Sequence, residues 1–261
     1  MNSLIGMAIV ATLGTWLVTA LGAATVVFFK SPSRRVLDMM LGFAAGVMIA
    51  ASFWSLLQPA IERAQVSSRL PPYLVATLGF LLGALFVGVC DKVVGRLSSR
   101  TDGSGVQGRT RMLMLSITLH NIPEGLAVGV AFGALGTGFD AEMLMGAISI
   151  AVGIGLQNFP EGAAVSVPLR RDGCSRRKSF FLGQASGMVE PVAGLLGAWL
   201  VVYVEAFLPY ALSFAAGTMI LVVVHELVPE CQKERETSSY FATAGIILGF
   251  AAMMLLDVML G

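Results

Sequence analysis

Eight long stretches of mostly apolar residues dominate this chain of 261 residues. A helix needs about 20 such residues to cross the ~30 Å hydrocarbon core of a bilayer, because it rises ~1.5 Å per residue. The sequence therefore predicts an all-α polytopic membrane protein, with a single transmembrane domain over residues 1–261. The eight expected transmembrane helices cover approximately 4–29, 36–61, 72–93, 112–134, 142–168, 179–204, 208–230 and 239–259.

Composition indicates the same class. Charged residues make up 13% of the chain, hydrophobic residues make up 56%, and the mean hydropathy is +0.81. A soluble domain carries about 25% charged residues, so an ordinary cytosolic enzyme and a disordered chain are excluded. A net charge of +1 offers no basic surface for phosphates, which excludes a nucleic-acid partner. Three widely spaced cysteines indicate neither a disulfide framework nor a thiolate zinc site.

The basic residues are unevenly divided between the two sets of loops. Fifteen of the 17 lysines and arginines lie in the loops that follow the first, third, fifth and seventh apolar stretches. Only Arg63 and Arg69 lie on the other side. Loops rich in Lys and Arg stay in the cytoplasm. We therefore expect a multi-pass protein of the cytoplasmic (inner) membrane with both termini extracytoplasmic.

Glycines recur four residues apart inside the apolar stretches. This spacing lets helices approach closely in lipid, where no hydrophobic force drives helices together. We expect close helix packing at five pairs, which are Gly42/Gly46, Gly79/Gly83, Gly129/Gly133, Gly183/Gly187 and Gly245/Gly249.

One short motif occurs twice, in the fourth and fifth apolar stretches. Residues 120–128 are HNIPEGLAV and residues 157–165 are QNFPEGAAV, so six of the nine positions are identical. Positions i and i+4 lie on one helix face, and the next position lies ~100° around the helix. Each copy thus offers two adjacent rows of potential ligands. These are His120 with Glu124, Gln157 with Glu161, and the neighbouring Asn121 and Asn158.

Each copy also contains a proline, Pro123 or Pro160. Proline has no N–H and cannot donate to the carbonyl four residues earlier. We expect each helix to be kinked or locally unwound there. Such breaks at membrane depth are tolerated where they line a cavity or a binding site.

Three glutamates are expected near the middle of the bilayer. Counting ~1.5 Å per residue from the cytoplasmic ends places Glu124, Glu161 and Glu190 roughly 10–18 Å deep in a ~30 Å core. No Lys or Arg lies in any stretch at this depth, so the carboxylates need cations or protons. Imidazole nitrogen with carboxylate oxygen suits a borderline divalent ion such as Zn²⁺, Fe²⁺ or Mn²⁺. The residues leave bound metal and proton exchange as alternatives.

At these residues the sequence resembles the ZIP (Zrt/Irt-like) family of divalent metal transporters, in particular its GufA-like branch. The resemblance covers essentially the whole chain. It implies an eight-helix bundle in a 3+2+3 arrangement, in which helices 1–3 and 6–8 form an inverted repeat around helices 4 and 5. It further implies a primary transport site at His120, Glu124, Gln157 and Glu161. The implied second site consists of Asn121, Asn158 and Glu190, with Glu124 and Glu161 as bridges.

The resemblance also implies a route for the ion. Met48 and Ser55 fall where the family has an apolar gate and a polar residue that face the site. His225 and Glu226 match a metal-contacting pair toward the cytoplasmic exit. One departure concerns Asn158, because some family members have Asp there, and the second site carries one negative charge fewer here. A second departure is that the loop between the third and fourth stretches lacks the histidines with which many relatives capture metal.

The leading hypothesis is therefore an importer of divalent metal into the cytoplasm, with no enzymatic activity and no bound cofactor. The transported ion is Zn²⁺ first, with Fe²⁺, Mn²⁺ or Cd²⁺ as further candidates. Relatives often dimerise, which makes a homodimer an expectation here.

Two other functions are compatible with the residues. One is a proton-coupled carrier of another solute, in which the glutamates relay protons. The other is an intramembrane metalloenzyme whose zinc activates water. Residues 225–229 are HELVP and lack the second histidine of an HExxH zinc site. A purely structural polar network would leave three buried acids unexplained.

Five further acids are expected at the outer ends of the helices. They either raise the local concentration of cations at the mouth or are solvated loop charges. These residues are Glu62, Asp140, Glu142, Glu205 and Asp257.

Overall fold

The computed structural model of the chain describes residues 2–28, 33–100, 106–137, 140–171, 173–203, 205–232 and 239–260. Almost all of these residues are helical, and none of them lies in a strand. The side chains of some helical residues, His120 among them, lie outside this description.

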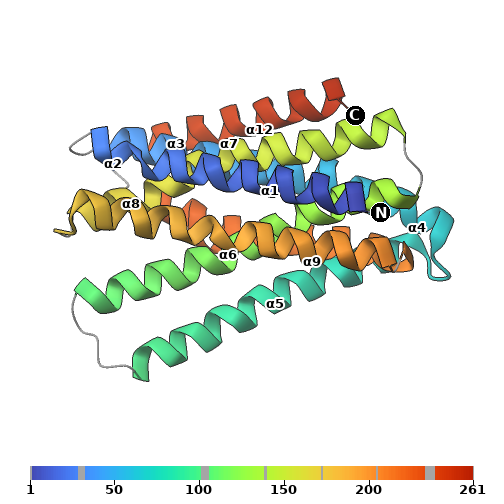
Figure 1. The fold of residues 1–261 in the computed structure, drawn as a ribbon, viewed down its shortest axis with the longest axis horizontal. Helices are drawn as coiled ribbons and strands as arrows, with labels where there is room; N and C mark the ends of the chain where they lie inside the picture. Colours follow the sequence, from blue (N-terminus) through green and yellow to red (C-terminus); the bar gives the residue numbers. More distant parts are fainter. Residues whose placement is uncertain are drawn as a thin grey trace.

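Eight long α-helices and several shorter helical pieces make up the described part of the fold (Figure 1). The long helices are α1 (Asn2–Ala23), α3 (Arg34–Ala51), α5 (Pro72–Arg100), α6 (Val106–Ala134), α7 (Ala141–Arg171), α9 (Val189–Tyr203), α10 (Leu208–Val222) and α12 (Ser239–Leu260). The shorter α-helices are α2 (Thr25–Phe28), α4 (Gln58–Ser67), α8 (Arg176–Ala185) and α11 (Val228–Cys231). The π-helices are η1 (Ser52–Leu57) and η5 (Val223–Leu227), and the 3-10 turns are η2 (Leu135–Thr137), η3 (Ser186–Met188) and η4 (Glu205–Phe207).

The helices lie side by side along one axis, and the two chain ends lie at the same end of the bundle (Figure 1). A chain that crosses a membrane an even number of times has both of its ends on the same side. Six helical segments of the described chain are long and apolar enough to cross a membrane. They are Ser3–Val27, Arg34–Val66, Pro72–Val93, Ala141–Arg170, Leu208–Cys231 and Tyr240–Met259. The chain is therefore an all-α, multi-pass membrane protein, and the two further spans at 112–134 and 179–204 remain a prediction.

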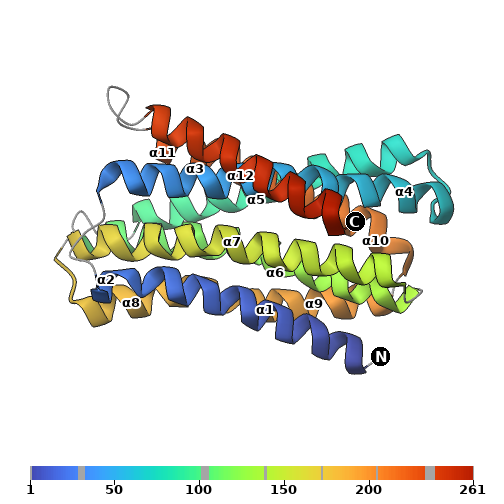
Figure 2. The ribbon, with the colours of Figure 1, turned by 90° about the horizontal axis from the view of Figure 1, so that it is seen from above.

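The helices fall into two groups (Figure 2). In one group α1 packs along α7 and α6 packs along α9; in the other α3 packs along α12 and α5 packs along α10. The pairs are related by symmetry. If α1 is exchanged with α9, α3 with α10, α5 with α12 and α6 with α7, the pair α1–α7 becomes α9–α6 and the pair α3–α12 becomes α10–α5. An inverted repeat around α6 and α7 predicts this pattern.

Glycines lie where the paired helices touch, as the sequence predicts. A side-chain carbon added at Gly46 of α3 would overlap the backbone of Ile246 in α12. One added at Gly83 of α5 would overlap the backbone of Phe214 in α10. The helix backbones are thus in direct contact, which gains van der Waals and weak C–H···O interactions in lipid.

The sequence predicts a kink or local unwinding at the motif prolines; the local unwinding does not occur, and a kink stays a prediction. Both α6 and α7 continue through Pro123 and Pro160 as α-helix, because one missing N–H removes only one bond of the ladder. The π-helical turns of the described chain lie elsewhere, in η1 and η5, and each precedes a different proline, Pro59 or Pro229. A π-turn of this kind frequently marks a functional position in a helix.

Replacing Gly46 with alanine is expected to push α3 and α12 apart and to lower the free energy of unfolding by about 1–3 kcal/mol. Gly14→Ala in α1 is the matched control, because a carbon added there meets nothing within 4 Å and alanine favours the helix. Unfolding of both variants in detergent micelles measures the difference. Equal stability of the two variants would contradict the packing described here.

Candidate functional site

Glu124 of α6 and Gln157 of α7 form the centre of a buried polar cluster. Both side chains are 0% exposed. The Gln157 amide Nε2 donates a hydrogen bond of 2.7 Å to Glu124 Oε1. The two copies of the sequence motif therefore meet between the antiparallel helices α6 and α7.

The cluster extends to the neighbouring motif residues. Asn121 of α6 and Asn158 and Glu161 of α7 are also buried. Glu190, at the start of α9, is buried beside them. The charges of Glu124, Glu161 and Glu190 are close enough to repel one another. Six of the seven predicted metal ligands thus lie in one buried region.

The glycine of each motif sets how closely a third helix approaches the cluster. A side-chain carbon at Gly125 would overlap the backbone oxygen of Glu190 in α9. One at Gly162 would overlap the backbone oxygen of Thr19 in α1. The two glycines occupy the same motif position, so α9 and α1 pack against α6 and α7 in corresponding ways.

Glu190 accepts hydrogen bonds from α1, and these contacts were not predicted from the sequence. Thr15 Oγ1 donates to Glu190 Oε2 at 2.5 Å, and Thr19 Oγ1 donates to Glu190 Oε1 at 3.3 Å. Asn158 Nδ2 donates to Glu190 Oε2 at 2.9 Å. The available signal was the spacing of Thr12, Thr15 and Thr19, which places three hydroxyls on one face of an otherwise apolar helix.

Several oxygens of the cluster have no hydrogen-bond partner in the part of the chain that the structure describes. These buried atoms are Asn121 Oδ1, Glu124 Oε2, Gln157 Oε1 and Asn158 Oδ1. A buried oxygen without a partner is costly, and native proteins rarely keep one without a reason. All four come from the two motif copies, and carboxylate and amide oxygens are common ligands of divalent cations.

The seventh predicted ligand, His120, lies in α6 one turn before Glu124, and its side chain is outside the described residues. Within the described side chains, no group of three or more His, Cys, Asp or Glu has an arrangement that could hold a metal ion. A site here would therefore need the amide oxygens of Asn121, Gln157 or Asn158, or the imidazole of His120, in addition to carboxylates.

A cavity of about 690 Å³ opens near the end of the bundle that holds the chain termini. Four of the five predicted outer acids line it, namely Glu62, Asp140, Glu142 and Asp257; the side chain of Glu205 lies outside the described residues. Ser55 of η1 also lines the cavity and donates to Asp257 Oδ1 at 2.7 Å. Ser149 of α7 donates to the same oxygen at 2.8 Å.

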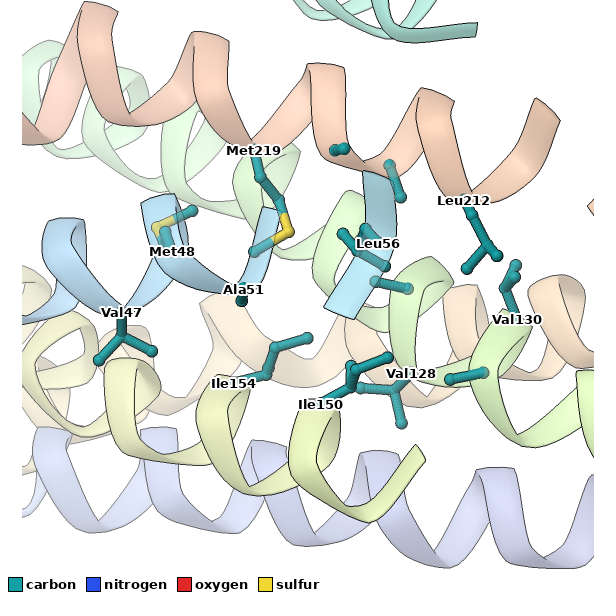
Figure 3. Packing of buried hydrophobic residues seen from close by; sticks show 14 of the residues in the cluster. Val47, Met48, Ala51, Leu56, Val128, Val130, Ile150, Ile154, Leu212 and Met219 are labelled. Atoms are coloured by element: carbon teal, nitrogen blue, oxygen red, sulfur yellow. The ribbon is translucent and has the colours of Figure 1, made fainter. Parts of the chain in front are cut away.

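An apolar layer lies beside this cavity. Figure 3 shows Met48 of α3, Met219 of α10 and Ile150 and Ile154 of α7 extending into one hydrophobic core. Ile150 also lines the cavity, and Ile154 is buried one turn further toward Gln157. Met48 belongs to the same hydrophobic core as Ile150, and its role as an apolar gate stays a prediction.

The predicted exit pair lies in η5, the second π-helix. His225 is exposed and Glu226 is half-buried. η5 packs against α3, α10 and α11. Ser55 and His225 each stand four residues before the proline that follows their π-helix, Pro59 or Pro229. Ser55 and His225 thus occupy corresponding positions in the two π-helices, η1 between α3 and α4 and η5 between α10 and α11.

Comparison with known proteins gives one consistent family. The sequence model of the ZIP zinc transporter family matches residues 96–257. The chain is 40% identical to zinc transporter ZIP11 of Bos taurus, over 100% of this chain and 99% of the relative. It is 37% identical to zinc transporter GufA of Myxococcus xanthus, over 98% and 100% of the two chains. Zinc transporter ZIPB of Bordetella bronchiseptica is 35% identical, over 98% of this chain and 82% of the relative.

Removing the amide of Gln157 is expected to destabilise the ion-free protein. Gln157→Leu leaves Glu124 Oε1 without its donor in a fully buried place, at a cost of about 1–3 kcal/mol in the free energy of unfolding. Ser166→Ala in the same helix is the control, because that hydroxyl donates to the backbone of its own turn and to no other group in the described part of the chain. Denaturant unfolding in a chelator measures both, and a stable Gln157→Leu variant would contradict the assigned contact.

Proposed function

We propose, since this chain belongs to the ZIP zinc transporter family, that it moves Zn²⁺ across a membrane through the polar cluster between α6 and α7. The observation that carries the proposal is the set of unpartnered buried oxygens on Asn121, Glu124, Gln157 and Asn158. These atoms lie among carboxylates that repel one another. A divalent cation supplies both the missing charge and the missing partner. Membership of a transporter family also argues against the alternative hypothesis of an intramembrane metalloenzyme.

The ion's ligands are drawn from both motif copies. Glu124, Gln157 and Glu161 supply oxygens from facing helices, and His120, which shares the helix face of Glu124, supplies the nitrogen. This mixed set without thiolates suits exchangeable binding of Zn²⁺ rather than a closed structural site. The same set accepts Fe²⁺, Mn²⁺ and Cd²⁺, which are proposed as secondary substrates.

The route begins at the outer cavity. Glu62, Asp140, Glu142 and Asp257 concentrate cations there, because a cleft lined by one sign of charge raises the local concentration of the opposite ion. The apolar layer around Met48 and Ile154 then closes the path between the cavity and the site. Passage requires this layer to open, and His225 and Glu226 in η5 receive the ion on the cytoplasmic side.

The membrane arrangement is proposed from charge and topology. The end of the bundle with α2 and α8 faces the cytoplasm, since the loops there hold most lysines and arginines. Both termini then lie outside the cytoplasm in an eight-span protein of the inner membrane. A homodimer is proposed from the resemblance alone.

Loss of either carboxylate from the α6–α7 pair is expected to stop transport. Glu124→Gln and Glu161→Gln should each lower zinc uptake into proteoliposomes at least about tenfold, because an anionic ligand is lost. Glu230→Gln in α11 removes a half-exposed carboxylate that pairs with Arg34 at 3.5 Å and is the control. Uptake is read with an internal zinc indicator. Unchanged uptake by both site variants would overturn the proposed site.

The orientation has a test based on cysteine labelling. Cys174 and residue 69 are separated by three expected spans and should lie on opposite sides of the membrane. With the other cysteines replaced by serine, an impermeant maleimide should label Arg69→Cys in intact cells and Cys174 only after permeabilisation. The reverse pattern would invert the topology, and labelling of both from one side would contradict the span count.

A further inference from the structure

Helix α1 carries a stripe of hydroxyl groups that the transport site, as derived above, does not use. Thr12, Thr15 and Thr19 are all buried, although the rest of α1 after Ser3 is apolar and the helix has no charged residue. Their spacing places them on one face. α1 packs against α6, α7, α8 and α9, and Thr12, Thr15 and Thr19 lie against the segment of η3 and α9 that holds Gly187, Glu190 and Gly194.

Two of the three hydroxyls reach Glu190. The 2.5 Å contact of Thr15 Oγ1 with Oε2 is the shortest of them, and Thr19 Oγ1 contacts Oε1 at 3.3 Å. Both hydroxyls also lie within reach of a backbone carbonyl of α1. A carboxylate is the stronger acceptor, since hydrogen bonds to a charged oxygen are about twice as strong as neutral ones. Each carboxylate oxygen of Glu190 therefore accepts from α1.

Asn158 completes this arrangement from α7. Its Nδ2 donates to Glu190 Oε2 at 2.9 Å and to the backbone oxygen of Thr15 at 3.3 Å. The amide is thereby oriented with its nitrogen toward Glu190, and its oxygen Oδ1 is left without a partner among the described residues. Asn158 links an anion held by α1 to an oxygen that is available for a cation.

The side-chain oxygens of Glu190 differ from those of the motif residues in their hydrogen-bond partners. Glu124 Oε2 and Gln157 Oε1 have no hydrogen-bond partner in the described part of the chain, whereas both oxygens of Glu190 have donors. A ligand must direct a lone pair at the ion, and an oxygen already bonded to hydroxyls is less available. An anion near the ion still lowers the ion's energy through Coulomb attraction.

Close packing keeps this geometry in place. A side-chain carbon at Gly187 would lie 2.9 Å from Glu190 Oε1 and 3.1 Å from Thr19 Oγ1. One at Gly194 of α9 would overlap Thr12. Small residues on η3 and α9 thus let α1 come close enough for its hydroxyls to reach the carboxylate.

We propose that α1 is part of the transport site, with Thr15 and Thr19 as positioning residues that hold Glu190 as a hydrogen-bonded anion beside the ion. This rests on the proposed function of the α6–α7 cluster. Glu190 contributes charge while Glu124, Gln157 and Glu161 contribute ligands. Fixing the anion through α1 strengthens ion binding, and it does so without adding another metal–oxygen bond that must break on release.

The test is a double-mutant cycle on zinc uptake by the full chain in proteoliposomes. Thr15→Val removes the hydroxyl with little change of shape and is expected to raise KM for Zn²⁺ about tenfold at nearly constant maximal rate. Thr15→Ser keeps the hydroxyl and should restore the wild-type KM. Thr19→Val, which loses the longer contact, should raise KM about threefold. In a Glu190→Gln background, Thr15→Val should add no further change, because the two residues act as one unit.

Thr12→Val is the matched control, since among the described residues that hydroxyl donates only to carbonyls of its own helix, and it should keep the wild-type KM. Additive effects of Thr15→Val and Glu190→Gln would overturn the proposal, and so would equal KM values for Thr15→Val, Thr15→Ser and wild type. If Thr15→Val does not fold, the Thr19→Val cycle decides in the same way. Failure of the wild type itself to carry zinc would contradict the proposed function, which keeps the two failures distinct.

Discussion

Burial of three carboxylates in an apolar helix bundle is the constraint on which the rest of the structure depends. Glu124, Glu161 and Glu190 come from three helices and lie within range of mutual repulsion. An uncompensated charge at this depth costs several kcal/mol. The structure offsets part of that cost with amide and hydroxyl donors from Gln157, Asn158 and α1. The remaining charge requires a cation, and the unpartnered motif oxygens provide the place for it.

Helix packing and site chemistry use the same residues. Gly125 and Gly162 let α9 and α1 touch α6 and α7, and these contacts bring Glu190 and its threonines to the cluster. The pairing of α1 with α7 and of α6 with α9 follows the symmetry of an inverted repeat. The first half of the repeat places α1 beside the motif helices, and the second half places α9 there. α9 contributes the carboxylate of Glu190, and α1 contributes the threonine hydroxyls that donate to it.

Much of this could be predicted from the sequence, because long apolar stretches and a repeated motif are strong local signals. Hydropathy located the six segments of the described chain that are long and apolar enough to cross a membrane, and counting residues from the helix ends placed Glu124, Glu161 and Glu190 at a common depth. The role of Thr15 was missed because it depends on a partner 175 positions away in the sequence. Local unwinding, one of the two outcomes expected at Pro123 and Pro160, does not occur because the ladder tolerates one lost bond, and the π-turns before Pro59 and Pro229 were not predicted from the sequence.

The proposed transport site requires a divalent cation as the missing charge between α6 and α7. The most direct test is a crystal structure of the zinc-soaked protein with anomalous diffraction at the zinc edge. The account predicts a peak between the two helices, with oxygens of Glu124, Gln157 and Glu161 at about 2.0–2.2 Å and Glu190 still bonded to Thr15. A peak confined to the outer cavity, with the α6–α7 cluster empty at saturating zinc, would contradict it.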